Sequence, residues 1–466
     1  MLALLYNLIL IFILPFAYVR LYIKSKKQPE YWQHKAERFA LNLKKISAKN
    51  FKNNNKNQQI IWIHAVSVGE IRGCQSLINE LLKNKSYKLL LTMTTPTGRA
   101  VAENLWEKEI QKQLLILNYL PYDVKYFQRK FLKFYQPKIA LLMETEIWLN
   151  LILECKNANI PTVLINARLS EKSKNNYQKN ALFRKLAKMA FENLSLVLAQ
   201  NDADAQRFLQ VGVNSQNLQI CGNLKFDVPI NKTLVDLGKS WKNFWKNSTN
   251  AVYQGQRFIF LAASTRDGEE ELLLEKWQKL LIKIRILAAR TQNRLANPLL
   301  VIVPRHPQRF DEIYDLAKNQ FNFNVVRRSQ KENIENLSAE DLAEIDILLG
   351  DSMGEMVAYY TFADAAVIGG SILNFGGQNL IEAAACGCPL LFCQKHMFNF
   401  ATAAENALKN QAAINFDEIG EISKFVENNY KDSNLDLYKK NALLFANSYK
   451  GATAKTLQIL KSKKYL

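Results

Sequence analysis

A chain of 466 residues is too long for a single hydrophobic core, because such cores stop growing at roughly 250–300 residues, so we expect two domains. The net charge of +20 favours an anionic partner. The basic residues are dispersed and form no arginine-rich arm, zinc-finger spacing or RNA-binding aromatic motif, so we expect an anionic membrane surface and no nucleic acid. A lysine-rich solvated surface would explain part of the same charge. Six cysteines without a CxxC pair and four scattered histidines indicate reduced thiols and no metal site.

The first segment, residues 1–23, is expected to be a membrane anchor. Residues 1–19 contain no charge and precede Arg20, Lys24 and Lys27. Nineteen residues at a rise of about 1.5 Å nearly match a ~30 Å hydrocarbon core. A cleaved signal peptide is disfavoured, because no basic region precedes the apolar run and no A-x-A-type site follows it. The basic flank predicts a single-pass or monotopic anchor, with the rest of the chain on the cytoplasmic side.

Short apolar runs alternate with amphipathic segments along the rest of the chain, which predicts parallel sheets with helices on both faces. The expected strands in residues 24–228 are IIWIHA, KLLLTM, KIALLM, TVLINA, LSLVLA and LQICG, and those in 257–445 are RFIFLAA, LLVIVP, IDILLG, DAAVIGG and PLLFC. We assign the polar stretch 229–256 to an interdomain linker, and 446–466 to a C-terminal helix that packs on either domain. The predicted fold is α/β, with two Rossmann-like domains facing across a cleft.

Polar residues follow the expected strands repeatedly, and ligands of open α/β sheets bind beyond the carboxyl ends of strands. In the first half these residues are His64, Ser67, Gly69 and Glu70, then Thr94, Thr95, Thr97 and Gly98, then Glu144 and Glu146, then Asn166 and Arg168. In the second half they are Ser264 and Thr265, then Pro304, Arg305 and His306. This placement predicts a functional site in each half.

The stretch 350–400 couples a glycine-rich turn to a helix start that holds Asn379 and Glu382. Glycines let the backbone approach a ligand closely. Free N–H groups and the positive end of a helix dipole favour a phosphate, and a carboxylate one turn later can accept hydrogen bonds from ribose. These features predict a nucleotide-sugar pocket. Alternatively, Asn379 and Glu382 stand at N-cap and N3 spacing and only complete the helix start.

Nine motifs occur in a characteristic order: HAVSVGE, TTPTG, LPYD, METEIW, NARLS, GNLKFD, PRHPQRF, GDSMGE and GGQNLIE. With them, the chain resembles the membrane-bound 3-deoxy-D-manno-octulosonic acid (Kdo) transferases of Gram-negative lipopolysaccharide synthesis, from the anchor to about Phe400. The resemblance implies a GT-B fold, cytidine-5′-monophospho-Kdo (CMP-Kdo) as donor and a lipid A precursor, lipid IVA, as acceptor. In that fold, residues 24–228 are expected to be the acceptor domain and 257–445 the nucleotide-sugar domain. The resemblance also implies inversion at the anomeric carbon, a location at the inner membrane with the catalytic domains on the cytoplasmic side, no cofactor and no catalytic metal.

The same resemblance implies the site residues. Glu70 matches the base, Glu144 a carboxylate that stabilises oxocarbenium-like charge, and Lys225 a cation for the leaving phosphate. The implied nucleotide contacts are Arg305, His306, Met353, Gly354, Glu355, Asn379, Leu380, Ile381 and Glu382.

From the residues alone, several of these positions keep a structural alternative. Glu70 is also a first-turn carboxylate favoured by the helix dipole. Glu146 would share a face with Glu144 in an extended segment, so spacing does not choose between them. His306 could be a structural histidine, and Glu355 has capping-box spacing from Ser352.

Other polar residues stay outside the predicted site. Arg99 and Arg168 could meet the donor carboxylate or the phosphates of the lipid. Asp202 and Asp204 form a D-x-D, which we interpret as an exposed helix start.

Gln378, Leu380 and Leu149 depart from the family patterns GGHNPLE and ETELWPN. Because a fold does not fix a reaction, two other functions stay open: a nucleotide-sugar hydrolase or epimerase, and a silent nucleotide-binding membrane scaffold.

Overall fold

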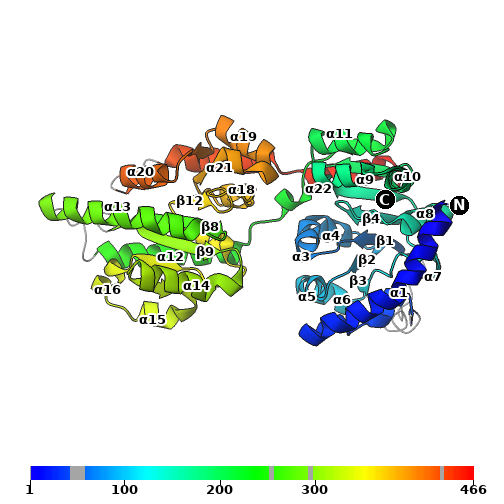
Figure 1. The fold of residues 1–466 in the computed structure, drawn as a ribbon, viewed down its shortest axis with the longest axis horizontal. Coiled ribbons are helices and arrows are strands. Elements are labelled where there is room, and N and C mark those ends of the chain that lie inside the picture. Colours follow the sequence, from blue (N-terminus) through cyan, green and yellow to red (C-terminus); the bar gives the residue numbers. More distant parts are fainter. Residues whose placement is uncertain (1, 42, 44–57, 251–256, 292–296, 431–434) are drawn as a thin grey trace. The chain divides into compact units, whose positions relative to one another are not determined.

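The computed structural model describes residues 2–41, 43, 58–250, 257–291, 297–430 and 435–466. The chain divides into two compact units: unit 1 is Met1–Val228 with Tyr449–Leu466, and unit 2 is Pro229–Ser448. Each unit is built on one seven-stranded sheet whose recorded strand pairs are all parallel. Figure 1 shows the helices packed around each sheet. The α/β class with two Rossmann-like sheets is confirmed.

The strands of unit 1 are β1 (Gln59–His64), β2 (Tyr87–Met93), β3 (Leu115–Tyr119), β4 (Ile139–Met143), β5 (Thr162–Ala167), β6 (Leu196–Ala199) and β7 (Leu218–Ile220). Its helices are α1 (Leu2–Lys27), α3 (Val68–Gly73), α4 (Gln75–Leu82), α5 (Pro96–Leu105), α6 (Glu107–Gln111), α7 (Lys125–Tyr135), α8 (Leu149–Asn157), α9 (Glu171–Gln178), α10 (Ala181–Phe191), α11 (Asp202–Gln210) and α22 (Ala452–Ser462).

The strands of unit 2 are β8 (Ile259–Thr265), β9 (Leu299–Pro304), β10 (Val325–Arg327), β11 (Ile347–Leu349), β12 (Ala365–Ile368), β13 (Leu390–Phe392) and β14 (Ala413–Asn415). Its helices are α12 (Lys232–Asn250), α13 (Glu269–Thr291), α14 (Phe310–Asp315), α15 (Lys331–Glu335), α16 (Ala339–Glu344), α17 (Met356–Phe362), α18 (Leu380–Ala385), α19 (Ala401–Lys409), α20 (Gly420–Asn429) and α21 (Asp436–Ser448).

The core of unit 1 lies on both faces of its sheet. Ile61 and Ile63 of β1 enter one hydrophobic cluster, whereas Trp62 enters another. Strands that are buried on both faces read as nearly continuous apolar runs, which is why β1 and β4 are apolar almost throughout. Ile459 and Leu460 of the C-terminal α22 belong to the first of these clusters. The sequence left two partners open for this helix, and the structure places it on unit 1.

The strand order locates the point in each sheet where ligands are expected. Unit 1 has the order β3-β2-β1-β4-β5-β6-β7, and unit 2 has the order β10-β11-β9-β8-β12-β13-β14. The chain therefore reverses its direction of winding between β1 and β4 in unit 1, and between β8 and β12 in unit 2. Ligands of open α/β sheets bind beyond the carboxyl ends of strands at such a switch point.

Several expectations need correction. The edge strands β3, β10 and β14 were not predicted: short apolar runs without clear alternation do not separate a strand from a helix. His64 is the last residue of β1 and fully buried, not a loop residue. Within 229–256, the segment assigned to a linker, α12 packs on α17 of unit 2, with the Trp241 and Tyr359 ring centroids 5.3 Å apart.

The predicted apolar N-terminal helix is confirmed as α1. Its 18-residue window reaches a mean hydropathy of 2.3, and by length and composition it is sufficient to cross a membrane. Within the described ranges, no second helix meets that criterion.

Candidate active site

Glu70 lies in the first turn of α3, directly after β1 and beside the switch point of unit 1. Its carboxylate accepts a hydrogen bond from the Val66 amide at 2.9 Å and one from the Ser67 hydroxyl at 3.0 Å. Glu70 therefore does lie in the first turn of a helix, as the structural alternative for this residue assumed. A carboxylate oxygen has more than one acceptor site, so these bonds do not exhaust its capacity to take a proton.

The electrostatic surroundings of Glu70 suit a base. Burial of the side chain raises the pKa of Glu70 above its ordinary value. The charge of Glu144 adds to the rise, whereas the Val66 amide and the Lys225 ammonium oppose it. The three residues predicted as catalytic are thus electrostatically coupled.

Glu144 and Lys225 form an ion pair, with 2.5 Å between Lys225 Nζ and Glu144 Oε1. Glu144 follows β4 directly, and its φ of 54° lies in the left-handed region, which is uncommon for a residue with a side chain. The stem of Lys225 packs over Gly73, where an added Cβ would overlap it. Because Gly73 ends the helix that carries Glu70, these contacts bring Lys225 and Glu144 to the same edge of the sheet.

Two asparagines hold the turn that presents Lys225. Asn223 Oδ1 accepts a hydrogen bond from the Lys225 amide at 3.0 Å, and Asn166 Oδ1 accepts one from the Leu224 amide at 2.9 Å. Asn166 is buried near the end of β5 with a φ of 50°. Sequence reasoning placed Asn166 at a strand end but gave it no role.

The structure gives Glu146 a different partner from Glu144. The Trp148 indole donates to Glu146 Oε2 at 3.0 Å. Burial, followed by the charge of Glu70, raises the pKa of Glu146 to about 7. Residues 144–145 form a turn, so Glu144 and Glu146 do not share the face of an extended segment, as the spacing argument assumed.

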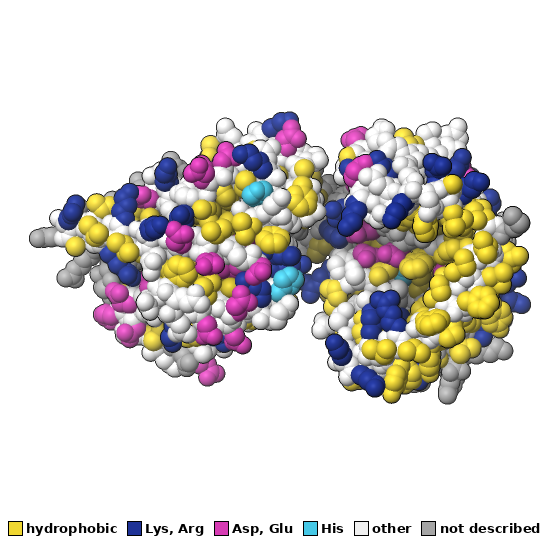
Figure 2. Space-filling view, viewed as in Figure 1, with side chains coloured by type: hydrophobic (Ala, Val, Ile, Leu, Met, Phe, Trp, Pro, Cys, Tyr) yellow, Lys and Arg dark blue, Asp and Glu magenta, His cyan; other side chains and the backbone are white. Residues whose placement is uncertain are grey.

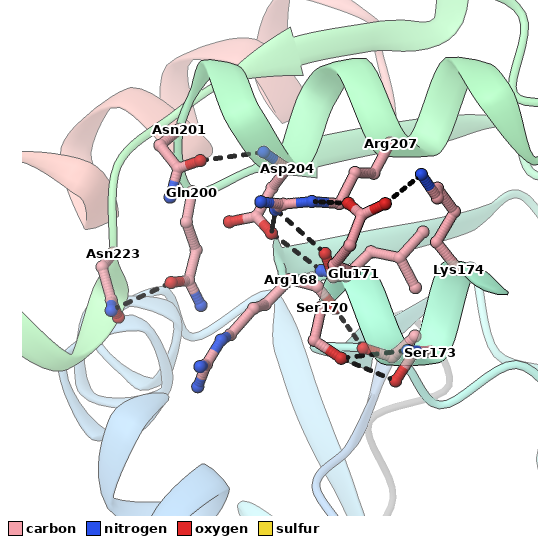
Figure 3. A network of polar contacts seen from close by, with 12 residues as sticks. Arg168, Ser170, Glu171, Ser173, Lys174, Gln200, Asn201, Asp204, Arg207 and Asn223 are labelled. Atoms are coloured by element: carbon pink, nitrogen blue, oxygen red, sulfur yellow. Dashed lines mark hydrogen bonds and ion pairs between the residues drawn. The ribbon is translucent and has the colours of Figure 1, made fainter. Parts of the chain in front are cut away.

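Figure 3 shows the polar network at the neighbouring loop after β5. Asp204 accepts from the Leu169 amide at 2.9 Å and pairs with Arg207 at 3.2 Å. Asn201 caps α11 by accepting from the Asp204 amide. Asp204 is only 3% exposed, so the interpretation of the D-x-D as an exposed helix start is wrong for this residue. The exposed Arg168 side chain points away from this network.

Arg99 has a structural partner in unit 1. Its guanidinium lies 2.8 Å from the carboxylate of the buried Glu37 and over the Tyr119 ring. Arg38 lies over the same ring, 4.0 Å from its centroid, and donates to the Thr94 carbonyl. Two cations and one carboxylate therefore surround Tyr119 at the carboxyl ends of β2 and β3.

In unit 2, a buried carboxylate holds the glycine-rich loop after β12. Glu269, at the start of α13, accepts from the amides of Gly370 at 2.8 Å and Leu373 at 2.9 Å. Burial raises the pKa of Glu269. A Cβ at Gly369 would overlap the Ser264 carbonyl, so glycine is required for this approach of β12 to β8.

The adjacent Glu270 holds the loop after β9 in the same way. It is fully buried and pairs with Arg309 at 2.8 Å, and the Thr265 hydroxyl donates to it. The Arg305 amide donates to the Thr265 carbonyl at 3.0 Å. Arg305 is exposed and His306 is half-buried at the start of the 3-10 helix Pro307–Arg309. Sequence reasoning missed both glutamates, although they follow Ser264 and Thr265 closely.

The remaining predicted nucleotide contacts lie at the starts of α17 and α18. Asn379 is the N-cap of α18 and accepts from the Ile381 amide at 3.1 Å, so its capping role is confirmed. Glu355 pairs with Arg328 at 3.1 Å and accepts from the Ser352 hydroxyl. Because α17 begins at Met356, Ser352 and Glu355 are not its N-cap and N3 residues, contrary to the spacing argument. Contact of these residues with a nucleotide stays a prediction.

The other five positions of this set are Met353, Gly354, Leu380, Ile381 and Glu382. Ile381 is buried and Glu382 is half-buried. Met353 is 69% exposed, and Gly354 has a φ of 81°. Leu380 is fully buried, so its side chain belongs to the core.

Comparison with known proteins identifies the family. A family model described as 3-deoxy-D-manno-octulosonic-acid transferase matches residues 33–228. The chain is 38% identical to a 3-deoxy-D-manno-octulosonic acid transferase of Bordetella pertussis, over 76% of this chain and 75% of that protein. It is 34% identical to the Haemophilus influenzae protein of the same name, over 81% of this chain and 78% of that protein.

Solved structures agree in fold. A glycosyltransferase from Rickettsia africae matches with a TM-score of 0.54 at 15% identity, over 87% of this chain and 98% of that chain. Anabaena HepE, solved in complex with UDP, matches with a TM-score of 0.54 at 13% identity, over 88% and 100%. These sheets and neighbours define the GT-B fold. The chain belongs to the family of 3-deoxy-D-manno-octulosonic acid transferases, which confirms the resemblance of its motifs.

Proposed function

We propose that the chain transfers Kdo from CMP-Kdo to a lipid A precursor, lipid IVA, with inversion at the anomeric carbon and without a divalent metal. The observation that carries this proposal is the position of Glu70 at the switch point of unit 1, coupled to the Glu144–Lys225 ion pair. Membership of the Kdo transferase family supports the sugar. The identity of the donor, the identity of the acceptor and the inversion at the anomeric carbon are parts of this proposal.

In the proposed reaction, Glu70 takes the proton of the acceptor hydroxyl as its oxygen bonds to the anomeric carbon. The bond from that carbon to the donor phosphate breaks, and its electron pair leaves with cytidine monophosphate (CMP). Lys225 has three N–H donors and gives one to Glu144, so within the described part of the chain two are free to stabilise the leaving phosphate. The Glu144 carboxylate offsets positive charge that develops on the sugar.

Mass spectrometry of lipid IVA, incubated with full-length protein, freshly generated CMP-Kdo and EDTA, tests the proposal. A mass gain of one or more Kdo units is expected. Donor consumed faster than in a protein-free control, without lipid product, would favour a hydrolase. Donor consumed no faster than in the control would leave a nucleotide-binding scaffold as the better explanation.

We also propose that the protein resides at the inner membrane, with both units on the cytoplasmic side. The apolar α1 and the basic residues at its carboxyl end support this location. Deletion of residues 1–23 should move the protein from the membrane to the soluble fraction in cell fractionation. Continued tight association would contradict a location that depends on α1.

A further inference from the structure

The amino half of α1 makes polar contacts with the globular part of unit 1. The Tyr6 hydroxyl donates to Asp123 Oδ2 at 3.0 Å. Asn7 Oδ1 accepts from the Lys125 amide at 2.8 Å and from Asn150 Nδ2 at 3.2 Å. These contacts join α1 to the starts of α7 and α8, which lie more than a hundred residues further along the chain.

Asn7 and Tyr6 take part in the hydrogen bonds that cap the starts of α7 and α8. Val124 is the N-cap of α7 and provides no side-chain cap, so Asn7 of α1 satisfies the first amide of that helix, at Lys125. Asp123 accepts from the amides of Asn150 and Leu151 at the start of α8, in addition to Tyr6. Asp123 is buried, so Tyr6 meets a carboxylate that is already fixed by α8.

The rest of α1 lies along unit 1 as well. The half-buried or buried positions recur every three or four residues, as one face of a docked helix requires: Ala3, Tyr6, Leu10, Leu14, Ala17 and Leu21. At the carboxyl half, the Tyr18 ring lies 5.5 Å from that of Trp32 and 6.0 Å from that of Phe39. Contacts with unit 1 therefore extend over about 27 Å of helix.

A helix that crosses a membrane cannot keep these contacts. Crossing a hydrocarbon core of ~30 Å would carry Tyr6 and Asn7 to the side opposite the globular units. Asp123 would then lose the Tyr6 hydroxyl, and the first amide of α7 would lose Asn7. The docked position and the spanning position exclude each other.

The opposite face of α1 is apolar and exposed. Its exposed side chains are Leu4, Leu5, Leu8, Ile9, Phe12, Phe16, Val19 and Ile23, and unit 1 also exposes Tyr126 of α7 and Leu182 and Phe183 of α10. Figure 2 shows hydrophobic side chains gathered over the part of unit 1 where α1 lies. Arg20, Lys24, Lys26 and Lys27 follow at the carboxyl end, and Lys35 lies over Trp32. An apolar face bordered by cations and aromatic rings fits an anionic lipid surface.

We propose that α1 is an in-plane helix: it stays docked on unit 1 through Tyr6 and Asn7 and inserts its exposed apolar face into one leaflet of an anionic bilayer. This inference rests on the membrane location proposed above. It connects α1 to the carboxyl edge of the unit 1 sheet, because the 3-10 helix Lys35–Phe39 that contacts α1 also carries Arg38, which donates to the Thr94 carbonyl after β2. The carboxyl edge that holds Glu70 is thereby tied to the lipid-binding face.

Vesicle flotation of the full-length protein tests whether the exposed apolar face of α1 binds an anionic lipid surface. We expect stronger flotation with vesicles of phosphatidylglycerol and phosphatidylethanolamine than with phosphatidylcholine alone. Absence of flotation with both would overturn the membrane location, and a stable dimer under those conditions would assign the apolar face to a second copy. Lipid IVA turnover in detergent, measured in parallel, separates either result from a failure of the proposed reaction.

Protease protection of a cleavable tag tests the orientation. A tag before Met1 should resist external protease in intact spheroplasts and be cleaved after lysis, as should a tag after Leu466. Cleavage of the amino-terminal tag alone in intact spheroplasts would show a spanning helix and overturn the proposal.

A pair of variants tests the docking contacts. Tyr6→Phe removes the hydroxyl bonded to Asp123 and should lower the thermal unfolding midpoint of vesicle-bound protein by a few degrees. Tyr22→Phe, the matched control, removes the same atom from an exposed residue of the same helix and should leave the midpoint unchanged. Equal midpoints for both variants and the unchanged protein would contradict docking.

Discussion

Opposing effects act on the pKa of Glu70: burial raises it, and the hydrogen bonds from Val66 and Ser67 lower it. Glu70→Gln keeps the size and one accepting oxygen but cannot take a proton, so we expect transfer to fall by about 10²–10⁴-fold, with CMP-Kdo binding unchanged. Turnover and donor affinity are measured on the same preparations. Glu80→Gln on α4, half-exposed and paired with Lys83, is the control. Unchanged turnover of Glu70→Gln would remove this residue as the base.

Lys225 lowers the pKa of Glu70 and, in the proposed reaction, also stabilises the leaving phosphate, so its loss should have two separable effects. Lys225→Met should reduce transfer by about 10²–10³-fold, as expected for removal of one preorganised donor. The substitution also removes a cation that lowers the pKa of Glu70. It leaves the Glu144 charge, which raises the pKa of Glu70, without its Lys225 partner. The base works in its ionised form, so the acidic limb of kcat/KM against pH should move to higher pH. Lys188→Met, an exposed lysine on α10, should leave the profile unchanged.

At the scale of elements, one turn of α13 connects two loops. Glu269 holds the amides of the glycine-rich loop, and Glu270 holds Arg309 in the loop that carries Arg305. Glu269→Gln retains the shape but loses a charged acceptor, and bonds to charged groups contribute about 1.5–3 kcal/mol. We expect CMP affinity, measured by calorimetry, to fall by at least tenfold.

The control for this prediction is Asp346→Asn. Asp346 is also buried in unit 2, where it accepts from the Asn324 amide and pairs with Arg285, but it precedes β11 at the opposite edge of the sheet. Both variants should lower stability, and only Glu269→Gln should weaken CMP binding. Equal affinities would show that Glu269 has no part in positioning a nucleotide site.

At the scale of the whole molecule, the last helix of the chain, α22, belongs to unit 1, which also contains the first strands. Leu460→Ala should remove about 2–5 kcal/mol from unit 1, because Leu460 is fully buried in its core. Hydrogen exchange followed by mass spectrometry should then show lost protection in β1–β7 and unchanged protection in β8–β14. Leu444→Ala, on α21 and 58% exposed, should change neither unit. Lost protection confined to unit 2 would contradict this assignment of α22.

The amino-acid sequence alone determined the α/β class, the apolar first helix, and the carboxyl-edge positions of Glu70, Glu144 and Arg305. These features are local: a strand buried on both faces is apolar throughout, and the residues after it must lie at the edge of the sheet. The family followed for a similar reason, because each motif occupies a fixed place between strands. The edge strands β10 and β14 were not predicted, because a strand of three residues is too short to show a hydrophobic periodicity.

Only the tertiary structure decided which distant residues meet. It separated Glu144 from Glu146 by giving the first to Lys225 and the second to Trp148. It buried Asp204 and placed α22 on unit 1. It also docked α1 through Tyr6, whose partner lies 117 residues away. Sequence periodicity reports the surroundings of one segment, whereas such contacts depend on the path of the chain between segments.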